Sequence, residues 1–394
     1  MLKLKGSLEI SGDKSVSHRA LILAAMSTGK TEITNLLESE DVMRTMKILK
    51  ELGIKIKKEG DVWLVYGNGT NGFIAPDRTL NCGNSGTTAR LMIGAVSSNP
   101  ISCTFVGDNS LSKRSMSRVT EHLKKIGAVV HITKGDYLPL IISGNEKLLP
   151  FKHEMIKASA QVKSALMLAA LNIHGKTKII EKTPTRDHTE RLFKYLKIGF
   201  RVKKLRNKVK ELEFNGPYEI RAKNIQVAGD PSSASFFIVG ALILPGSKVK
   251  LKNVMLNPTR IAFLKVLKSM GGKIKIIKTN NVSGEDVGNI TAEYSKLKGV
   301  KIPSSMSAFL IDEYPILSIA ASQAKGKTTM MGLDELRQKE SDRIKSIYYN
   351  LRKIGIKVLE KNNNLTIYGK EIDIKRNIKI RSFADHRIAM SFSI

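Results

Sequence analysis

The sequence Asp13-Lys-Ser-Val-Ser-His-Arg19 is the first of six short polar stretches, and each is followed by small apolar residues. The other five begin at Asn84, Ser159, Asp230, Asp312 and Asp385. Successive stretches start 71 to 82 residues apart. Asp, Asn and Ser commonly open helices, and a helix N-terminus presents unpaired N–H groups and a partial positive charge. The spacing predicts six repeated units whose helix N-termini converge on a shared cleft and bind phosphate or carboxylate.

A second signal repeats inside the first five units. A second helix ends at a glycine 40 to 43 residues after the polar opening, at Gly53, Gly127, Gly199, Gly271 and Gly355. Glycine suits the left-handed position that closes a helix, and an alternating strand follows. In the first unit the pattern predicts helices over 16–26 and 42–52 and strands over 31–35, 54–57 and 62–66. A period near seventy residues indicates small α/β subdomains.

The first helix of each unit is apolar on nearly every side, as in residues 20–26, 165–171 and 236–242. Such a helix is buried in its subdomain, and only its polar end reaches solvent. The sixth unit stops at Ile394 inside an apolar helix, so we expect a truncated last subdomain or one completed by another segment. Residues 2–10 read as a strand without a unit of its own. We expect this strand to pair with the last units and to join both chain ends in one domain.

Composition limits the class of protein. The 394 residues indicate about two domains, and 42% hydrophobic with 26% charged residues is typical of soluble proteins. We expect no membrane segment and no signal peptide. Two cysteines make no disulfide framework, so a cytoplasmic location is expected. The net charge of +31 favours anionic partners. Its lysines are scattered and aromatic residues make up only 6%, which favours a small anionic substrate over nucleic acid.

Several motifs are excluded or weak. Three Gly-Lys-Thr triplets, at 29–31, 175–177 and 326–328, lack the earlier glycine of a phosphate-binding P-loop and lead from helix into strand. The histidines and cysteines show no zinc-ligand spacing, so neither a metal nor a cofactor is predicted. Lys339 and Arg343 are four residues apart, which would place them on one face of a helix with Glu340 beside them.

Together, these segments resemble the 5-enolpyruvylshikimate-3-phosphate (EPSP) synthase family over nearly the whole chain. The matching segments are 14–19, 83–87 with Arg90, 107–111 with Arg114, 159–161, 185–189, 229–230, 312–315, 339–343 and 385–387. The resemblance implies an α/β enolpyruvyl transferase fold with two domains, each of three subdomains around buried helices. One domain would comprise residues 1–12 and 228–394, with its last subdomain incomplete, and the other residues 13–227.

The family's reaction moves the enolpyruvyl group of phosphoenolpyruvate to the 5-hydroxyl of shikimate 3-phosphate and releases phosphate, on the way to chorismate and aromatic amino acids. By resemblance, shikimate 3-phosphate is held by Lys14, Ser15, Arg19, Ser159, Ala160, Gln161, Arg186, Asp312 and Lys339. Phosphoenolpyruvate is held by Lys14, Gly86, Arg114, Gln161, Arg343 and Arg387. Asp312 is expected to act as the base that activates the hydroxyl. Glu340 and Lys14 both remain candidates for protonating the methylene carbon.

Three departures from the family pattern stand out. Leu91 and Ser115 follow the two arginines after which the family often has proline, so weaker phosphoenolpyruvate binding is expected. A further substrate-facing lysine of the family would lie beyond Ile394, which puts the activity of this chain in doubt.

Gly86 leaves room for glyphosate, so sensitivity to that inhibitor is expected.

Two other functions remain open. The related UDP-N-acetylglucosamine enolpyruvyl transferases share the architecture, but their loop cysteine is replaced here by Asn109, and Ser15 follows Lys14 where they have asparagine. An RNA-binding module of the same subdomain type would use the net charge of +31. We expect a monomer that binds neither nucleic acid nor membranes.

Overall fold

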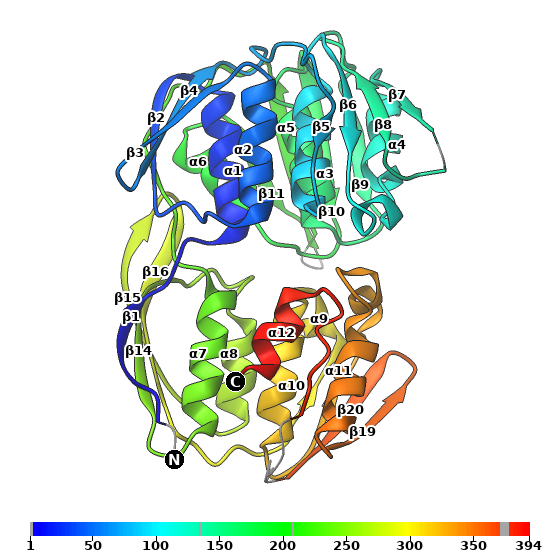
Figure 1. Cartoon of the computed structure of the whole chain (residues 1–394). Coiled ribbons are helices and arrows are strands. Elements are labelled where there is room, and N and C mark those ends of the chain that lie inside the picture. Colours follow the sequence, from blue (N-terminus) through cyan, green and yellow to red (C-terminus); the bar gives the residue numbers. More distant parts are fainter. Residues whose placement is uncertain (1–2, 134, 207–208, 371–377) are drawn as a thin grey trace. The chain divides into compact units, whose positions relative to one another are not determined.

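The computed structural model describes residues 3–133, 135–206, 209–370 and 378–394, and these form two compact units. The first, called here the terminal unit, comprises Met1–Ser11, Gly229–Asn281 and Asp286–Ile394. The second, called the inserted unit, comprises Gly12–Ala228 and Val282–Glu285. Figure 1 draws both units.

The inserted unit contains three four-stranded sheets and six α-helices in its described residues. Its helices are α1 (Lys14–Ala25), α2 (Glu40–Glu51), α3 (Gly86–Val96), α4 (Ser117–Lys125), α5 (Ala160–Ala169) and α6 (His188–Tyr195). Its first sheet is formed by β13 (Ile225–Gln226), β2 (Thr28–Thr34), β4 (Val62–Asn68) and β3 (Lys55–Glu59). The second is formed by β5 (Leu80–Asn81), β6 (Ser102–Val106), β8 (Leu140–Ser143) and β7 (Val129–Ile132). The third is formed by β9 (Lys152–Met155), β10 (Gly175–Glu181), β12 (Lys210–Gly216) and β11 (Arg201–Lys204).

The terminal unit repeats the same pattern over its described residues. Its helices are α7 (Pro231–Ile243), α8 (Ala262–Ser269), α9 (Ser307–Leu310), α10 (Tyr314–Ser322), α11 (Arg343–Lys353) and α12 (His386–Phe392). One sheet consists of β1 (Lys5–Glu9), β14 (Lys248–Met255), β16 (Glu285–Glu293) and β15 (Lys273–Val282). The other consists of β17 (Lys301–Ile302), β18 (Gly326–Met330), β20 (Asn364–Gly369) and β19 (Lys357–Lys361).

All five sheets share one topology, as the repeat predicts. In each sheet an edge strand lies parallel to its neighbour, and that neighbour lies antiparallel to the strand on its other side. In three sheets the edge strand comes before the first helix of the same repeat in the chain. In the other two sheets the edge strands are exchanged: β1 precedes the first repeat but lies in the sheet of the fourth, and β13 precedes the fourth repeat but lies in the sheet of the first. β1 pairs with β14 of the fourth repeat, so the expected N-terminal strand lies in the terminal unit but not beside the last repeats. β13 pairs with β2 of the first repeat.

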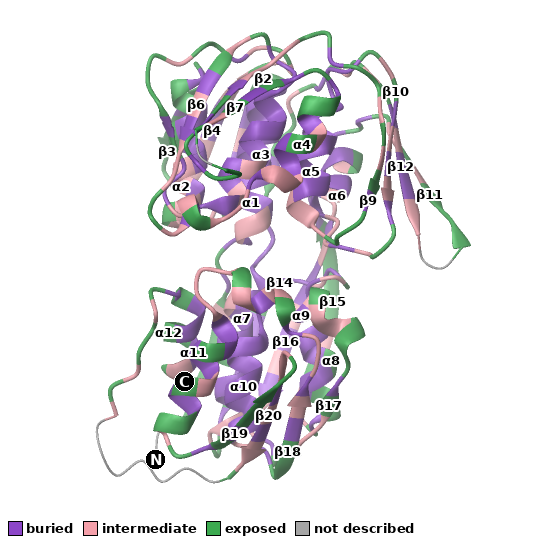
Figure 2. Cartoon of the chain, turned by 90° about the vertical axis from the view of Figure 1, so that its right-hand side faces the viewer, coloured by how far each residue is buried: buried purple, intermediate pink, exposed green. Residues whose placement is uncertain are grey.

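The first helix is largely buried in five of the six repeats, as the sequence predicts, but α12 of the sixth repeat has only Arg387, Ile388 and Ser391 buried. Every residue from Val16 to Ala25 in α1 is buried, and α5 and α7 are buried along most of their length. Figure 2 shows these helices in purple within their units. In the terminal unit, α7 shares one apolar core with side chains of α8, α10 and α11, among them Phe263, Leu317 and Ile347. The burial leaves the N-terminal ends as the polar part of each helix.

The predicted helix openings are mostly confirmed. The side chains of Asp13, Ser85, Ser159, Asp230 and Asp385 each accept a hydrogen bond from a backbone N–H of the helix that follows. The fifth opening differs, because Glu313 lies at the cap position of α10 and makes no side-chain capping bond. The adjacent Asp312 carboxylate contacts Arg343 and Arg387.

The helix-ending glycines are confirmed at four of five positions. Gly53, Gly127, Gly271 and Gly355 have positive φ. The prediction for Gly199 is wrong, because α6 ends at Tyr195 and the left-handed residue is Lys197, with φ of 59°. The third repeat thus closes its second helix two residues earlier than the glycine pattern indicates.

A third repeated glycine escaped the sequence analysis. A Cβ at Gly144 would lie 2.1 Å from the carbonyl oxygen of Asn99 and 2.3 Å from that of Val96. A Cβ at Gly67 or Gly369 would lie 2.2 Å or 2.0 Å from a carbonyl oxygen at the end of the first helix of its repeat, and one at Gly216 would lie 2.7 Å from the carbonyl oxygen of Ile173. A glycine at this place lets the last strand of the sheet cross the helix end, because no side chain stands between the two backbones.

Candidate functional site

The N-terminal ends of α1, α3 and α5 are tied together in the inserted unit. Arg19 of α1 donates to the hydroxyl of Ser164 on α5 at 2.7 Å and to that of Thr189 on α6 at 2.7 Å. Gln161 of α5 donates to the hydroxyl of Thr87 on α3 at 3.0 Å. These bonds bring three helix N-termini into one polar region, which favours anions.

Most candidate binding residues of the inserted unit lie in this region. Lys14 and Ser15 begin α1, Gly86 begins α3, and Ser159 and Ala160 are the cap and first residue of α5. The ammonium of Lys14 lies 3.0 Å from the carboxylate of Asp41 on α2. Arg186 lies half-buried in the segment between β10 and α6.

Arg90 belongs to this region, although the sequence analysis assigned it no role. Its guanidinium donates to Gln161 Oε1 at 2.9 Å and to the carbonyl oxygen of Ser115 at 3.0 Å. Burial, and then the positive charges of Arg114 and Arg118, lower the pKa of Arg90 to about 10. Adjacent positive charges destabilise one another, so an anion bound here would relieve their repulsion. The signal in the sequence was the glycine-rich stretch that ends in Arg90.

Arg114 approaches the same helix end. It donates to Asn84 Oδ1 at 2.6 Å and to Ser110 Oγ at 2.9 Å. Its Nε is buried and has no hydrogen-bond partner among the described residues. A Cβ built on Gly86 would lie 2.7 Å from Arg90 Nη1 and 3.7 Å from Arg114 Nη1. Gly86 therefore lies beside both guanidinium groups.

A buried chain of hydroxyl groups connects α1, α2 and α3 behind this surface. His18 Nδ1 lies 2.7 Å from the hydroxyl of Thr45, which lies 2.7 Å from that of Thr88. Burial lowers the pKa of His18 to about 3, so its ring is neutral near pH 7. The neutral His18 ring thus links α1 to α2 through Thr45 and adds no positive charge.

The terminal unit gathers carboxylates around two arginines. Arg343 is fully buried and lies 2.9 Å from Asp385, 2.7 Å from Glu340 and 3.3 Å from Asp312. Arg387 Nε lies 3.5 Å from Asp312 Oδ1. Burial opposes the charge of Arg343, but the three carboxylates outweigh it and raise its pKa. Asp312, which caps no helix, is instead held between two guanidinium groups.

Lys339 lies near this cluster, but not as the sequence predicted. Residues 339–342 are not helical, and α11 begins only at Arg343. The prediction that Lys339 and Arg343 share one face of a helix is therefore wrong. The reason is Asp342, whose side chain accepts a hydrogen bond from Lys345 N and caps α11. Burial lowers the pKa of Lys339, and the nearby charge of Asp312 opposes that shift.

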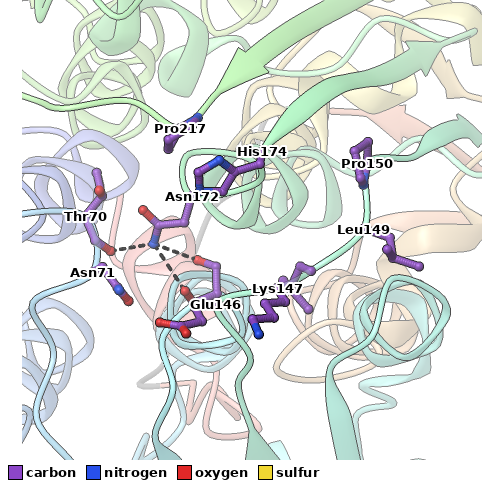
Figure 3. A pocket seen from close by; sticks show the side chains of 11 residues that line it. Thr70, Asn71, Glu146, Lys147, Leu149, Pro150, Asn172, His174 and Pro217 are labelled. Atoms are coloured by element: carbon purple, nitrogen blue, oxygen red, sulfur yellow. Dashed lines mark hydrogen bonds between the residues drawn. The ribbon is translucent and has the colours of Figure 1, made fainter.

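Other possible sites have less support. Among the described residues no cluster of His, Cys, Asp and Glu has the composition of a metal site, and no described helix is long and apolar enough to cross a membrane. Figure 3 shows an open pocket near the other ends of α3 and α5, where Asn172 donates to the carbonyl oxygen of Thr70 at 2.7 Å. None of the candidate site residues lines this pocket.

The fold is that of the enolpyruvyl transferases. The enolpyruvyl transferase NikO of Streptomyces tendae superposes with a TM-score of 0.73 over 93% of this chain and 82% of its own, at 15% sequence identity. EPSP synthase from Acinetobacter baumannii superposes with a TM-score of 0.85 over 99% of this chain and 88% of its own, at 38% identity.

The sequence comparisons identify the family. The family model of EPSP synthase (3-phosphoshikimate 1-carboxyvinyltransferase) matches residues 1–394. The 3-phosphoshikimate 1-carboxyvinyltransferase of Parvibaculum lavamentivorans is 43% identical over 99% of this chain and 87% of its own length. That of Zymomonas mobilis is 42% identical over the same shares. The chain belongs to the EPSP synthase family, which confirms the resemblance seen in the sequence, and it is an enzyme of that transferase class.

Proposed function

We propose that this chain transfers the enolpyruvyl group of phosphoenolpyruvate to the 5-hydroxyl of shikimate 3-phosphate, with release of phosphate. The observation that supports it best is the set of arginines and helix N-termini around Gln161 in the inserted unit. Both substrates are highly anionic, and charge-assisted hydrogen bonds to phosphate or carboxylate contribute about 1.5–3 kcal/mol each. The membership in the EPSP synthase family supports the same reaction.

The roles of the residues follow the family pattern. Lys14, Arg19 and Arg186, with the α5 opening at Ser159, Ala160 and Gln161, would bind shikimate 3-phosphate. Arg114, Arg343 and Arg387, with the backbone at Gly86, would bind phosphoenolpyruvate, because guanidinium groups bind carboxylate and phosphate in a bidentate way. Arg343 now contacts three carboxylates, so substrate binding there requires an exchange of partners.

The acid–base roles follow from the carboxylates. Asp312 would take the proton of the attacking hydroxyl, since a carboxylate within hydrogen-bond reach of a hydroxyl can act as general base. Glu340 and Lys14 remain the candidates for protonating the methylene carbon. Glu340 is paired with Arg343 at 2.7 Å and Lys14 with Asp41 at 3.0 Å, so each candidate has an oppositely charged partner in this structure.

The decisive experiment is calorimetric titration with shikimate 3-phosphate, followed by phosphoenolpyruvate while phosphate release is measured. We expect binding of the first substrate and phosphate release that depends on both. Turnover with UDP-N-acetylglucosamine in place of shikimate 3-phosphate would support the related transferase instead. Salt-dependent RNA binding without transferase activity would contradict the proposal. The monomeric state is a further prediction, which light scattering during size-exclusion chromatography checks.

Gly86→Ala is expected to make the enzyme less sensitive to glyphosate. The new Cβ would lie 2.7 Å from Arg90 Nη1, so the guanidinium must move away from the helix end. We expect the inhibition constant for glyphosate to rise by at least about tenfold, with a smaller rise in the KM for phosphoenolpyruvate. Gly199→Ala is the control, because its Cβ would have only an ordinary contact at 3.7 Å with Tyr218. Unchanged inhibition of Gly86→Ala would contradict the placement of the inhibitor beside this glycine.

A further inference from the structure

A buried ionic cluster lies inside the inserted unit, and none of the roles above uses it. The ammonium of Lys163, on α5, lies 2.8 Å from Glu181 Oε1 and 2.6 Å from Glu190 Oε1. The side chain of Lys163 is fully buried, and those of the two glutamates are almost so. Because charges lose their hydration on burial, such a cluster is weak evidence for a gain in stability. A role in fixing local geometry accounts for it better.

The cluster holds the segment that carries Arg186. Glu181 is the last residue of β10, and its Oε1 accepts hydrogen bonds from both the backbone N and the hydroxyl of Thr185. The same oxygen receives the ammonium of Lys163. Thr185 is buried, whereas its neighbour Arg186 is half-buried. The residue before Arg186 is therefore fixed to α5 through two buried side chains.

The residues after Arg186 are fixed as well. Asp187 accepts a hydrogen bond from Arg191 at 2.9 Å, and His188 Nδ1 lies 2.7 Å from Glu285 Oε1. The backbone on both sides of Arg186 is thus held by polar contacts. Arg186 itself is half-buried between these anchored residues.

The same cluster adjoins Arg19. Ser164 follows Lys163 on α5 and accepts from Arg19, and Thr189 precedes Glu190 on α6 and also accepts from Arg19. Both arginines assigned to shikimate 3-phosphate are therefore positioned by residues next to the buried ions. Orienting cationic groups before the ligand arrives lowers the cost of binding.

We propose that Lys163, Glu181 and Thr185 form a positioning relay that sets the Arg186 segment for the phosphate of shikimate 3-phosphate. This inference rests on the proposed function. Thr185 is a positioning residue: it acts through the backbone of Arg186, and its hydroxyl is used by Glu181. Loss of the Thr185 hydroxyl removes its hydrogen bond to Glu181, so ordering the Arg186 segment around the phosphate costs more free energy and the affinity falls. The chemistry at Asp312 is unaffected.

The test compares three conservative variants by titration with shikimate 3-phosphate and by steady-state kinetics. Thr185→Val removes the hydroxyl and keeps the shape, and Thr185→Ser restores the hydroxyl. Thr177→Val is the matched control, because Thr177 is a buried residue of β10, the strand that ends at Glu181, and its hydroxyl has no hydrogen-bond partner in the described part of the chain. Binding stoichiometry separates lost affinity from lost folded protein.

Thr185→Val is expected to raise the Kd for shikimate 3-phosphate about tenfold, with kcat at saturation unchanged within about twofold. Thr185→Ser and Thr177→Val should bind like the wild type. Wild-type affinity in Thr185→Val, or an equal loss in Thr177→Val, would overturn the relay and leave the proposed function intact. Failure of the wild-type chain to bind shikimate 3-phosphate would instead refute the proposed function itself.

Discussion

Replacing Asp312 with Ala is expected to lower kcat by about 100- to 10,000-fold, the range that general acid–base catalysis contributes. The carboxylate lies 3.3 Å from Arg343 and 3.5 Å from Arg387, so its position is fixed by two guanidinium groups. It does not cap α10, so its loss removes no capping bond from that helix. The affinity for shikimate 3-phosphate should fall far less than turnover, because we propose that several other cationic residues also bind that substrate.

The measurement is single-turnover phosphate release together with titration of shikimate 3-phosphate. Asp334→Ala serves as the control, because Asp334 is an exposed aspartate of the same unit and no role in substrate binding is assigned to it. Wild-type turnover in Asp312→Ala would remove Asp312 from the mechanism. A loss in affinity as large as the loss in kcat would make it a binding residue only.

Lys163→Met is expected to lower the free energy of unfolding by about 3–5 kcal/mol, because it leaves Glu181 and Glu190 buried without their cation. Urea denaturation of wild type and variant measures the difference. Lys178→Met is the control: Lys178 pairs with Glu211 at 3.0 Å on a more exposed face, where ion pairs contribute little. A stability of Lys163→Met equal to that of the control would show that the buried cluster needs no lysine.

The pH dependence of this difference has a definite sign. Burial opposes the charge of Lys163, but the attraction of Glu190 and Glu181 prevails and raises its pKa above the usual 10.5. A raised pKa gives stability that is fully present below the unfolded value and is lost as the pH rises through the folded value. The difference in free energy of unfolding between wild type and Lys163→Met should therefore stay constant from neutral pH to about pH 10 and become smaller only above that pH.

The sequence predicted the repeat because local signals determine it. Asp13, Ser159 and Asp230 open helices through hydrogen bonds that span two or three residues, and such bonds depend on little else. The same local logic failed at Gly199, where Lys197 takes the left-handed position. It also failed at Asp342, which caps α11, so the helix that the sequence predicted over 339–343 begins only at Arg343. In both cases a residue a few positions away competed for the helix end.

The candidate site was predictable only in part. Motifs pointed to Lys14, Arg114, Asp312 and Arg387 through family resemblance. Lys14, Asp312 and Arg387 lie at or beside helix openings, and Arg114 reaches the opening of α3 through its hydrogen bond to Asn84. Arg90 was quoted within a motif but given no role, because its contact with Gln161 joins residues 71 positions apart. The relay through Lys163 was not foreseen either, since a lysine in an apolar helix carries no signal of its partners.

By itself the sequence determined the α/β repeat, the buried first helices and the family, since capping, glycine turns and apolar runs act over a few neighbouring residues. Only the tertiary structure decided that β1 pairs with β14 and β13 with β2, and that Arg343 is shared by three carboxylates. The physical reason is that strand pairing and buried ion pairs join residues far apart in the chain. Their energies depend on distance and burial, which no local pattern specifies.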